Sequence, residues 1–147
     1  MPTSVKELSL SRQYSFQYEN FIVATQQEVF LLLEKQGATV HALRFPFTRL
    51  RYGGPNDEAR SGHPLGKVGL GYYGLYQVEQ SPWLQEVVAE NRVHPSHSDA
   101  LFANKKHFVA CFKDVMLEVI SSGYQEVAMP ESELFTIINQ QLGHLQE

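Results

Sequence analysis

The sequence has one cysteine in 147 residues, Cys111, and it lies in the apolar run FVACF. An intramolecular disulfide is therefore impossible, and a zinc site built from several cysteines is excluded. Nothing near Cys111 in the sequence would clearly activate a thiol. Its simplest interpretation is a small buried hydrophobic residue.

Long hydrophobic runs and a strong charge of one sign are also lacking. No apolar stretch approaches the roughly 18 residues of a membrane-spanning helix, and the N-terminus has no signal-peptide pattern. The formal net charge is −4, so there is no overall field that attracts polyanions. These absences predict a cytoplasmic protein that binds neither nucleic acid nor a membrane.

What is present indicates a globular protein rich in sheet. Hydrophobic residues make up 43% and aromatic residues 12% of the chain, and aromatic side chains favour half-buried strands. We predict an α+β fold in one domain over residues 1–147, with residues 1–13 frayed or forming a short helix. The expected architecture is a single antiparallel sheet of about five or six strands with two helices packed on it.

The strand pattern begins at Tyr14, Phe16 and Tyr18, which alternate, and it continues through residues 21–23. The next stretch, residues 26–36, fits two structures.

Thr25 followed by Glu28 matches a helix capping box, whereas VFLLL is typical of a buried strand. The strongly β segment ATVHALRF follows directly, so we favour a strand that turns back at Lys35-Gln36-Gly37.

Helix signals are clearest in the second half. Ser81-Pro82-Trp83-Leu84 combines a capping residue with a first-turn proline, and apolar residues recur at helical spacing after Pro130. Between them, HFVACF and VMLEVIS flank Lys113-Asp114 and predict a tight β-hairpin.

Three long segments resemble a group of small bacterial proteins: PNDEARSGHPL, GYYGLYQVEQSPWLQEVVAENRVHP and HFVACFKDVMLEV. Members of that group carry a similar PNDEA…GHPL segment, a tyrosine–glycine strand, a Trp-containing helix and a late hairpin. The resemblance covers about two-thirds of the chain and implies a shared fold without a chemistry. Residues 113–116, KDVM, stand where that group has a His-Asp turn and a small hydroxyl residue.

Arginines mark the first candidate site. Residues 38–52 predict one long strand, or two broken at Pro46, and Arg49 and Arg51 share one face of it about 7 Å apart. Two guanidinium groups at that spacing suit a carboxylate or phosphate. The alternative is that they pair with acids on a neighbouring element.

Residues 53–74, GGPNDEARSGHPLGKVGLGYYG, contain seven of the ten glycines. Loops of this length in compact domains are usually functional or disordered. We expect an ordered loop that covers one end of the sheet and binds a small polar or anionic ligand. The predicted ligand-binding residues are Arg49, Arg51, Asn56, Asp57, His63, Tyr72 and Tyr73.

Two other hypotheses remain open. One is a small cofactor-independent lyase, isomerase or hydrolase that uses His63 with Asp57 or Glu58 as its acid–base pair. The other is a protein-interaction module or homodimer that docks through Trp83 or the C-terminal helix.

No cofactor or metal site is predicted. GLGYYG at 69–74 matches GxGxxG, but it runs into an expected strand instead of a helix. The scattered histidines include an HxxH at His94 and His97 in a proline-containing loop, where that spacing does not bring two imidazoles together. Sequence alone does not place the others relative to one another.

Overall fold

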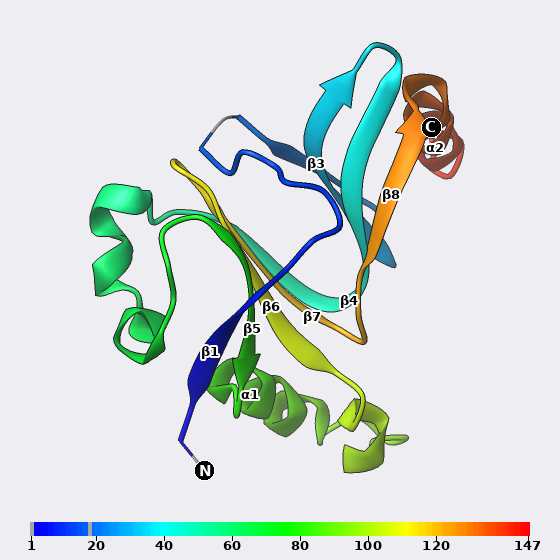
Figure 1. Cartoon of the computed structure of the whole chain (residues 1–147). Helices are drawn as coiled ribbons and strands as arrows, with labels where there is room; N and C mark the ends of the chain where they lie inside the picture. The colour runs from blue at the N-terminus through cyan, green and yellow to red at the C-terminus, as the bar shows by residue number, and fades with distance from the viewer. Residues whose placement is uncertain (1, 18) are drawn as a thin grey trace.

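The computed structural model describes residues 2–17 and 19–147, and eight antiparallel strands form its central sheet (Figure 1). The strand order is β1-β5-β6-β7-β4-β3-β2, with β8 pairing β4. The strands are β1 (Ser4–Leu8), β2 (Phe21–Ala24), β3 (Glu28–Gln36), β4 (Thr39–Gly53), β5 (Gly74–Glu79), β6 (Lys106–Cys111), β7 (Met116–Ser121) and β8 (Gln125–Pro130).

Strand β4 is long enough to belong to both halves of this sheet. Its first part, 39–46, pairs with β3 and β8, and its second part, 47–53, pairs with β7. The register shifts between Phe47 and Arg49, directly after Pro46, where proline provides no ladder donor. We call β1, β5, β6, β7 and 47–53 the β7 half, and β2, β3, β8 and 39–46 the β3 half.

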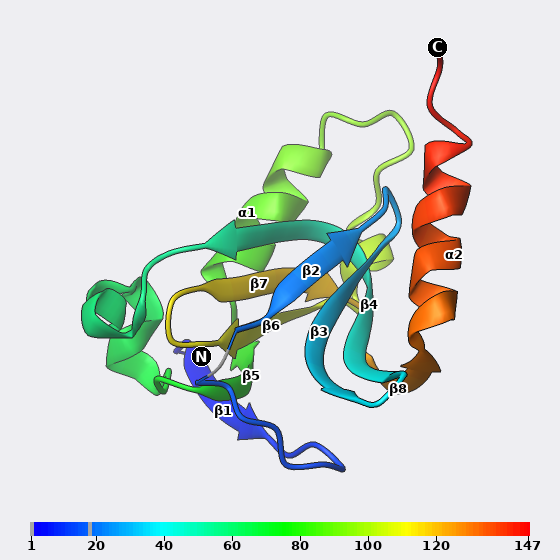
Figure 2. The same ribbon diagram turned by 90° about the horizontal axis from the view of Figure 1, so that it is seen from above.

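The inner faces of the two halves pack against each other and form the main core (Figure 2). Val29 and Phe45 from the β3 half meet Phe108 and Val119 from the β7 half, and all four are at most 2% exposed. Burial of this apolar area supplies the main favourable contribution to folding.

The helices and short 3-10 segments cover the outer faces. Helix α1 (Pro82–Asn91) packs Trp83 and Val87 on Ile120 of the β7 half, and α2 (Glu131–Leu142) packs Leu134 on the β3 half. The remaining segments are η1 (Asp57–Gly62), η2 (Pro64–Val68) and η3 (Asp99–Phe102). The α+β class with one antiparallel sheet is confirmed.

The predicted number of five or six strands is too low, chiefly because β1 and β8 were missed. All five residues of β1 pair with β5, so much of the stretch 1–13 that we expected to fray or form a helix is a strand. Strand β8 adds to β4 from a segment only six residues long. Both lie at sheet edges, and their partners are distant in sequence, so local pattern gave a weak signal.

The strand predicted from Tyr14 begins too early. Residues 13–17 form a loop whose Phe16 ring stacks on Phe112 with 4.9 Å between centroids, and Tyr18 lies outside the described residues. Phe16 therefore anchors a loop in the core. Strand β2 starts only at Phe21.

The ambiguous stretch 26–36 is a strand from Glu28 onward, as favoured. Thr25 and Glu28 do interact, but they close the turn before β3: the Thr25 hydroxyl oxygen accepts hydrogen bonds from the amides of Gln27 and Glu28. The hairpin of β6 and β7, the helix beginning after Ser81 and the C-terminal helix are also confirmed. Among the described residues, no helix is long and apolar enough to cross a membrane.

Candidate functional site

The glycine-rich segment 53–74 is held in shape by a buried arginine. Arg60 is only 1% exposed, and its guanidinium donates hydrogen bonds to three backbone carbonyls, those of Pro55 (3.0 Å), Phe112 (2.6 Å) and Tyr72. These acceptors lie at both ends of the segment and in the β6–β7 turn. One side chain therefore ties the segment to itself and to the hairpin.

Polar residues predicted to bind a ligand take part in the same local structure. Asn56 caps η1 by accepting a hydrogen bond from the amide of Ala59, and the Tyr73 hydroxyl donates to Asp57 at 2.5 Å. Hydrogen bonding to Asp57 raises the pKa of Tyr73. Tyr72 supplies its backbone carbonyl to Arg60, and the residue as a whole is 56% exposed.

The underside of the segment packs on the sheet. Leu65 is buried against Val109, Cys111 and Met116 on the outer face of the β7 half. Gly71 permits the close approach of the Tyr76 phenol, since a Cβ at this position would lie 2.1 Å from that hydroxyl oxygen. The GxGxxG pattern thus serves the packing of a tyrosine and leads into β5.

Arg49 and Arg51 both turn towards α1. Arg49 forms an ion pair with Glu90 at 2.9 Å, and the Arg51 guanidinium stacks over the Trp83 ring at 4.1 Å from its centroid. A cation over an indole face is attracted by the ring quadrupole. Trp83 itself is buried against Ile120. Its ring thus lies between the sheet and Arg51 and holds the start of α1 in place.

His63 is paired with a residue that sequence reasoning missed. Its Nε2 lies 3.1 Å from Oε2 of Glu118 in the middle of β7, whereas Asp57 is taken up by Tyr73. The amide of Leu65 donates to His63 Nδ1 at 3.0 Å. In the neutral ring the hydrogen must then sit on Nε2, which donates it to the Glu118 carboxylate.

The second carboxylate oxygen of Glu118 contacts another histidine, His107, which is buried deeper in the protein. Glu118 Oε1 lies 2.9 Å from His107 Nε2, and His107 Nδ1 lies 2.7 Å from the Ser81 hydroxyl. Glu118 and His107 are diagonal neighbours on β7 and β6, and Ser81 caps α1. We call Ser81, His107, Glu118 and His63 the buried polar chain, since their relative exposures run from 2% for His107 to intermediate for His63.

The hydrogen positions in the buried polar chain follow from its fixed donors. Ser81 Oγ accepts the Leu84 amide at 3.0 Å, so the serine hydroxyl is free to donate its own hydrogen to His107 Nδ1 when that ring is neutral. His107 then donates from Nε2 to Glu118. Every polar atom of the network is satisfied, as burial requires.

Glu118 is held as a carboxylate. Burial by itself would raise its pKa, but hydrogen bonding and charge interaction with His107, and then with His63, outweigh burial and lower the pKa. An ionised carboxylate hydrogen-bonded to an imidazole orients the ring and stabilises the imidazolium that forms when the ring takes up a proton.

The backbone before Ser81 is unusual. Gln80 has φ of 54°, the only positive φ at a non-glycine residue in the described part of the chain, and its carbonyl accepts the Thr3 hydroxyl at 2.8 Å. Glutamine pays a cost of order 1 kcal/mol in the left-handed region. The turn directs the chain from the end of β5 straight into α1, with Ser81 at the corner.

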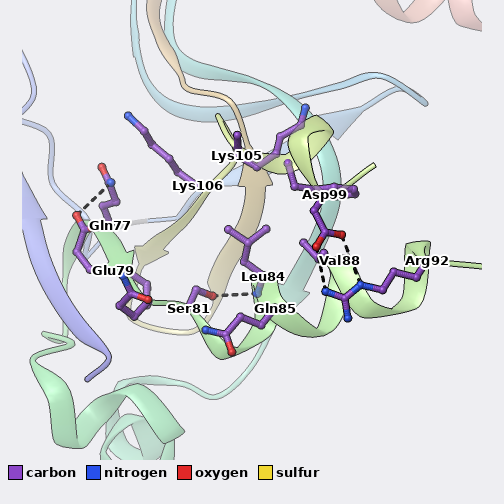
Figure 3. A pocket seen from close by; sticks show the side chains of 14 residues that line it. Gln77, Glu79, Ser81, Leu84, Gln85, Val88, Arg92, Asp99, Lys105 and Lys106 are labelled. Atoms are coloured by element: carbon purple, nitrogen blue, oxygen red, sulfur yellow. Dashed lines mark hydrogen bonds and ion pairs between the residues drawn. The ribbon is translucent and has the colours of Figure 1, made fainter. Parts of the chain in front are cut away.

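Ser81 also lines a pocket of about 580 Å³ between the end of β5, α1, η3 and the start of β6, which we call the α1 pocket (Figure 3). Its walls are mixed: Leu84, Val88 and Phe102 are apolar, while glutamines and charged residues supply the rest. Figure 3 shows the Ser81 hydroxyl directed at the first turn of α1, with Gln85 beside it.

Both acidic residues of the α1 pocket form ion pairs, whereas two of its lysines form none among the described residues. Glu79 pairs with Lys6, and Asp99 pairs with Arg92 and His97. Hydrogen bonds from His97 and then from Arg92 lower the pKa of Asp99. Within the described residues, Lys105 and Lys106 have no carboxylate within 4.0 Å.

Two other hollows formed by the described residues lack this combination. A larger one of about 870 Å³ runs along residues 7–17 and reaches Tyr73 and Gly74, and a groove of about 410 Å³ lies between α2 and the outer face of the β3 half, where Phe21 and Phe135 are more than half exposed. Neither touches the buried polar chain. The expectation that the C-terminal helix docks on a partner or second copy stays a prediction.

Sequence reasoning found His63 and Ser81 but not the groups that join them. Ser81 was identified only as a helix cap. Glu118 had a signal that went unused, namely one carboxylate in the middle of an apolar strand, VMLEVIS, where burial demands partners. His107 is near the start of the strand expected from HFVACF, where the sequence alone shows no partner for it. Its contact with Glu118 depends on the register between β6 and β7.

No group of three or more His, Cys, Asp or Glu side chains in the described residues is arranged to hold a metal ion. The chain matches no protein-family model, and searches of curated proteins and of solved structures found no match.

Proposed function

We propose that the chain is a binding domain for a small organic anion, which it holds in the α1 pocket. The observation that carries the proposal is a cavity of about 580 Å³ whose acids are already paired and whose Lys105 and Lys106 are free of carboxylates. Pockets of roughly 300–1,000 Å³ are the usual size for small-molecule sites.

The walls define the ligand further. Leu84, Val88 and Phe102 offer apolar contact, and the side-chain amides of Gln77 and Gln85 offer donors and acceptors. A ligand that fits carries a short apolar or aromatic part and one carboxylate or phosphate group. Because the chain's net charge is −4, attraction for an anion must come from local cations such as these two lysines.

The glycine-rich segment contributes indirectly. It packs Leu65 on the sheet and presents His63 to Glu118, on the far side of the buried polar chain from the pocket. The predicted ligand class is therefore kept, while its proposed position moves from segment 53–74 to α1.

Isothermal titration calorimetry with three related compounds tests the proposal. Phenyl phosphate combines an apolar ring with an anion, phenol lacks the anion, and inorganic phosphate lacks the ring. We expect phenyl phosphate to bind at least about tenfold more tightly than either fragment, which corresponds to about 1.4 kcal/mol. Equal binding of phenol, or no binding of phenyl phosphate, would overturn the proposal.

Paired substitutions place the ligand. Lys105→Ala with Lys106→Ala removes both free cations and should weaken phenyl phosphate by about tenfold or more, because a charge-assisted hydrogen bond contributes about 1.5–3 kcal/mol. Lys113→Ala removes an exposed lysine in the β6–β7 turn and is the matched control. Equal effects of the two changes would indicate a general charge effect.

A further inference from the structure

Ser81, His107 and Glu118 form a hydrogen-bonded series in the order nucleophile, base and acid. The distances are 2.7 Å from Ser81 Oγ to His107 Nδ1 and 2.9 Å from His107 Nε2 to Glu118 Oε1. Both fall within the range in which a general base takes a proton from a hydroxyl. Ser81 is 4% exposed and is among the residues that line the α1 pocket, so the series ends at the pocket wall.

Three further features favour chemistry at Ser81. Gln80, immediately before it, has the positive φ that turns the chain sharply at this point, and strained backbone tends to gather at reactive sites. Ser81 stands at the N-terminus of a ten-residue helix, where the dipole favours developing negative charge. The Trp83 amide belongs to the first turn, whose N–H groups have no acceptor within the helix.

A purely structural role explains less of this arrangement. Capping α1 needs only the bond from the Leu84 amide to Ser81 Oγ. It does not need a buried imidazole on the serine, or a buried carboxylate with a second histidine behind it. Placing an ionised Glu118 in the interior costs free energy that a hydrophobic residue would not.

We propose that the α1 pocket is an esterase or acyl-transfer site in which Ser81 is the nucleophile, His107 the general base, and the substrate a carboxylic ester or thioester bearing an anionic group. The anionic group is the part that the proposed binding function supplies, so the inference rests on that function and adds a reaction to it.

The proposed reaction has two stages, acylation of Ser81 and hydrolysis of the acyl group. Ser81 Oγ attacks the acyl carbon while its proton passes to His107 Nδ1, and collapse breaks the bond to the leaving oxygen or sulfur, which takes the proton from Nδ1. An alcohol or thiol leaves, and Ser81 carries the acyl group. Water then attacks this ester, gives a proton to His107, and releases the acid as Ser81 Oγ recovers the proton.

Glu118 and His63 are positioning residues in this scheme. Glu118 accepts the Nε2–H of His107 throughout and stabilises the imidazolium between steps. His63 donates to the other carboxylate oxygen at 3.1 Å, which keeps Glu118 ionised and its plane fixed. The glycine-rich segment thereby acts on the α1 pocket from the other end of the buried polar chain, on the same outer face of the sheet.

The first test uses the unmodified chain. A fluorophosphonate probe is incubated with the protein, and the adduct is located by peptide mass spectrometry, with and without phenyl phosphate. We expect one adduct, on Ser81, with phenyl phosphate slowing its formation. Adducts confined to lysine or tyrosine, or none at all, would overturn the proposal. If phenyl phosphate still binds in that case, the binding function survives alone.

Turnover is the second test. Mono-4-nitrophenyl glutarate carries an anionic arm, and 4-nitrophenyl butyrate is its neutral counterpart. We expect the anionic ester to be cleaved with the higher kcat/KM, and His107→Gln to lower kcat by about a hundredfold or more, the usual size of a general-base contribution. Equal rates for unmodified protein and His107→Gln would contradict the role of His107.

His63→Gln separates positioning from folding. If His63 orients Glu118, kcat per folded molecule falls by about tenfold, the lower end of the loss seen when an outer partner of a functional side chain is removed, while KM stays unchanged. If its role is only structural, the melting temperature falls and kcat per folded molecule does not. Lys113→Ala, outside the pocket and the buried polar chain, should leave both constants unchanged.

Discussion

The outer face of the β7 half has two coverings that differ in construction. Segment 53–74 has a conspicuous sequence and is packed tightly on the sheet. The buried Arg60 donates hydrogen bonds to three backbone carbonyls, and Leu65 fills the space between the segment and the sheet. Helix α1 begins with an ordinary capping serine and leaves a pocket of about 580 Å³ beside it. The glycines here serve the backbone path of a closed segment, and the groups that we propose to bind and react lie at an ordinary helix start.

The two coverings are nevertheless connected. The buried polar chain runs from His63 in the segment, across β7 and β6, to Ser81 at the start of α1. A change in how the segment sits would reach the pocket through Glu118. We therefore expect substitutions in segment 53–74, His63 apart, to affect mainly stability, and substitutions at α1 to affect mainly the proposed binding and reaction.

The largest effect should come from Arg60. Arg60→Met leaves three carbonyls without their donor, and orphaned buried acceptors cost about 1–3 kcal/mol each, so we expect the free energy of unfolding to fall by about 3 kcal/mol or more. Urea unfolding followed by circular dichroism measures this. Arg12→Met, which removes an arginine from an exposed ion pair with Glu34, should cost less than about 1 kcal/mol. Similar losses in the two variants would refute the role of Arg60.

A matched pair of leucine and valine truncations compares the packing under each covering. Leu65→Ala should destabilise the fold by about 2–4 kcal/mol, since the residue is enclosed, whereas Val88→Ala on the pocket wall should cost about 1 kcal/mol or less. Leu65 is 6% exposed and Val88 is half-buried. The midpoint of urea unfolding reports both. A larger loss at Val88 would mean that the pocket wall is the tighter of the two.

Glu118, which lies between the two coverings, should make the free energy of unfolding depend on pH. Its pKa is lowered in the folded protein from an ordinary value of 4.5, so its contribution is present above that value and is lost as the pH falls through the folded pKa. Glu118→Gln should cost about 1–3 kcal/mol at neutral pH and lose less stability between neutral and acid pH than the unmodified chain. Unfolding free energies measured from pH 7 down to acid, with exposed Glu133→Gln as control, check this. Parallel curves would contradict it.

The smallest effect concerns Tyr76, whose hydroxyl donates to the Tyr73 carbonyl at 2.6 Å. Burial raises the pKa of Tyr76 to about 12 from 10.0, so folding favours the neutral phenol. Stability from this group is complete below 10.0 and is lost as the pH rises towards 12. Tyr76→Phe should therefore flatten the alkaline part of the stability curve, and Tyr72→Phe, at an exposed ring, should not. Identical alkaline losses in both variants would count against this origin.

Sequence reasoning reached the parts of the fold that depend on neighbours in the chain. The Ser81 cap, the β6–β7 hairpin and the strand character of 28–36 follow from local pattern and turn chemistry. Strands β1 and β8 are short and pair with residues far away in sequence, so nothing local marked them. The candidate site could be predicted only in part for the same reason. His63 and Ser81 stand in recognisable local patterns, while the contact of Glu118 with them depends on the sheet register.

Arg60 illustrates the other limit. One arginine in a polar, glycine-rich stretch reads as solvated, and only the folded segment surrounds it with carbonyls. Burial of a guanidinium on backbone acceptors is a consequence of tertiary structure, because a charged group is costly to bury unless hydrogen bonds compensate it. The two terminal nitrogens of Arg60 find such acceptors, whereas its Nε has no partner among the described residues.

Amide NMR with phenyl phosphate tests the central claim most directly, because it reports both coverings in one titration of the unmodified chain. We expect concentration-dependent shifts at the amides of Ser81, Leu84, Lys105 and Lys106, with residues 55–72 unmoved apart from those next to His63. Shifts centred on residues 55–72, with the start of α1 unchanged, would contradict the account and return the recognition site to the glycine-rich segment.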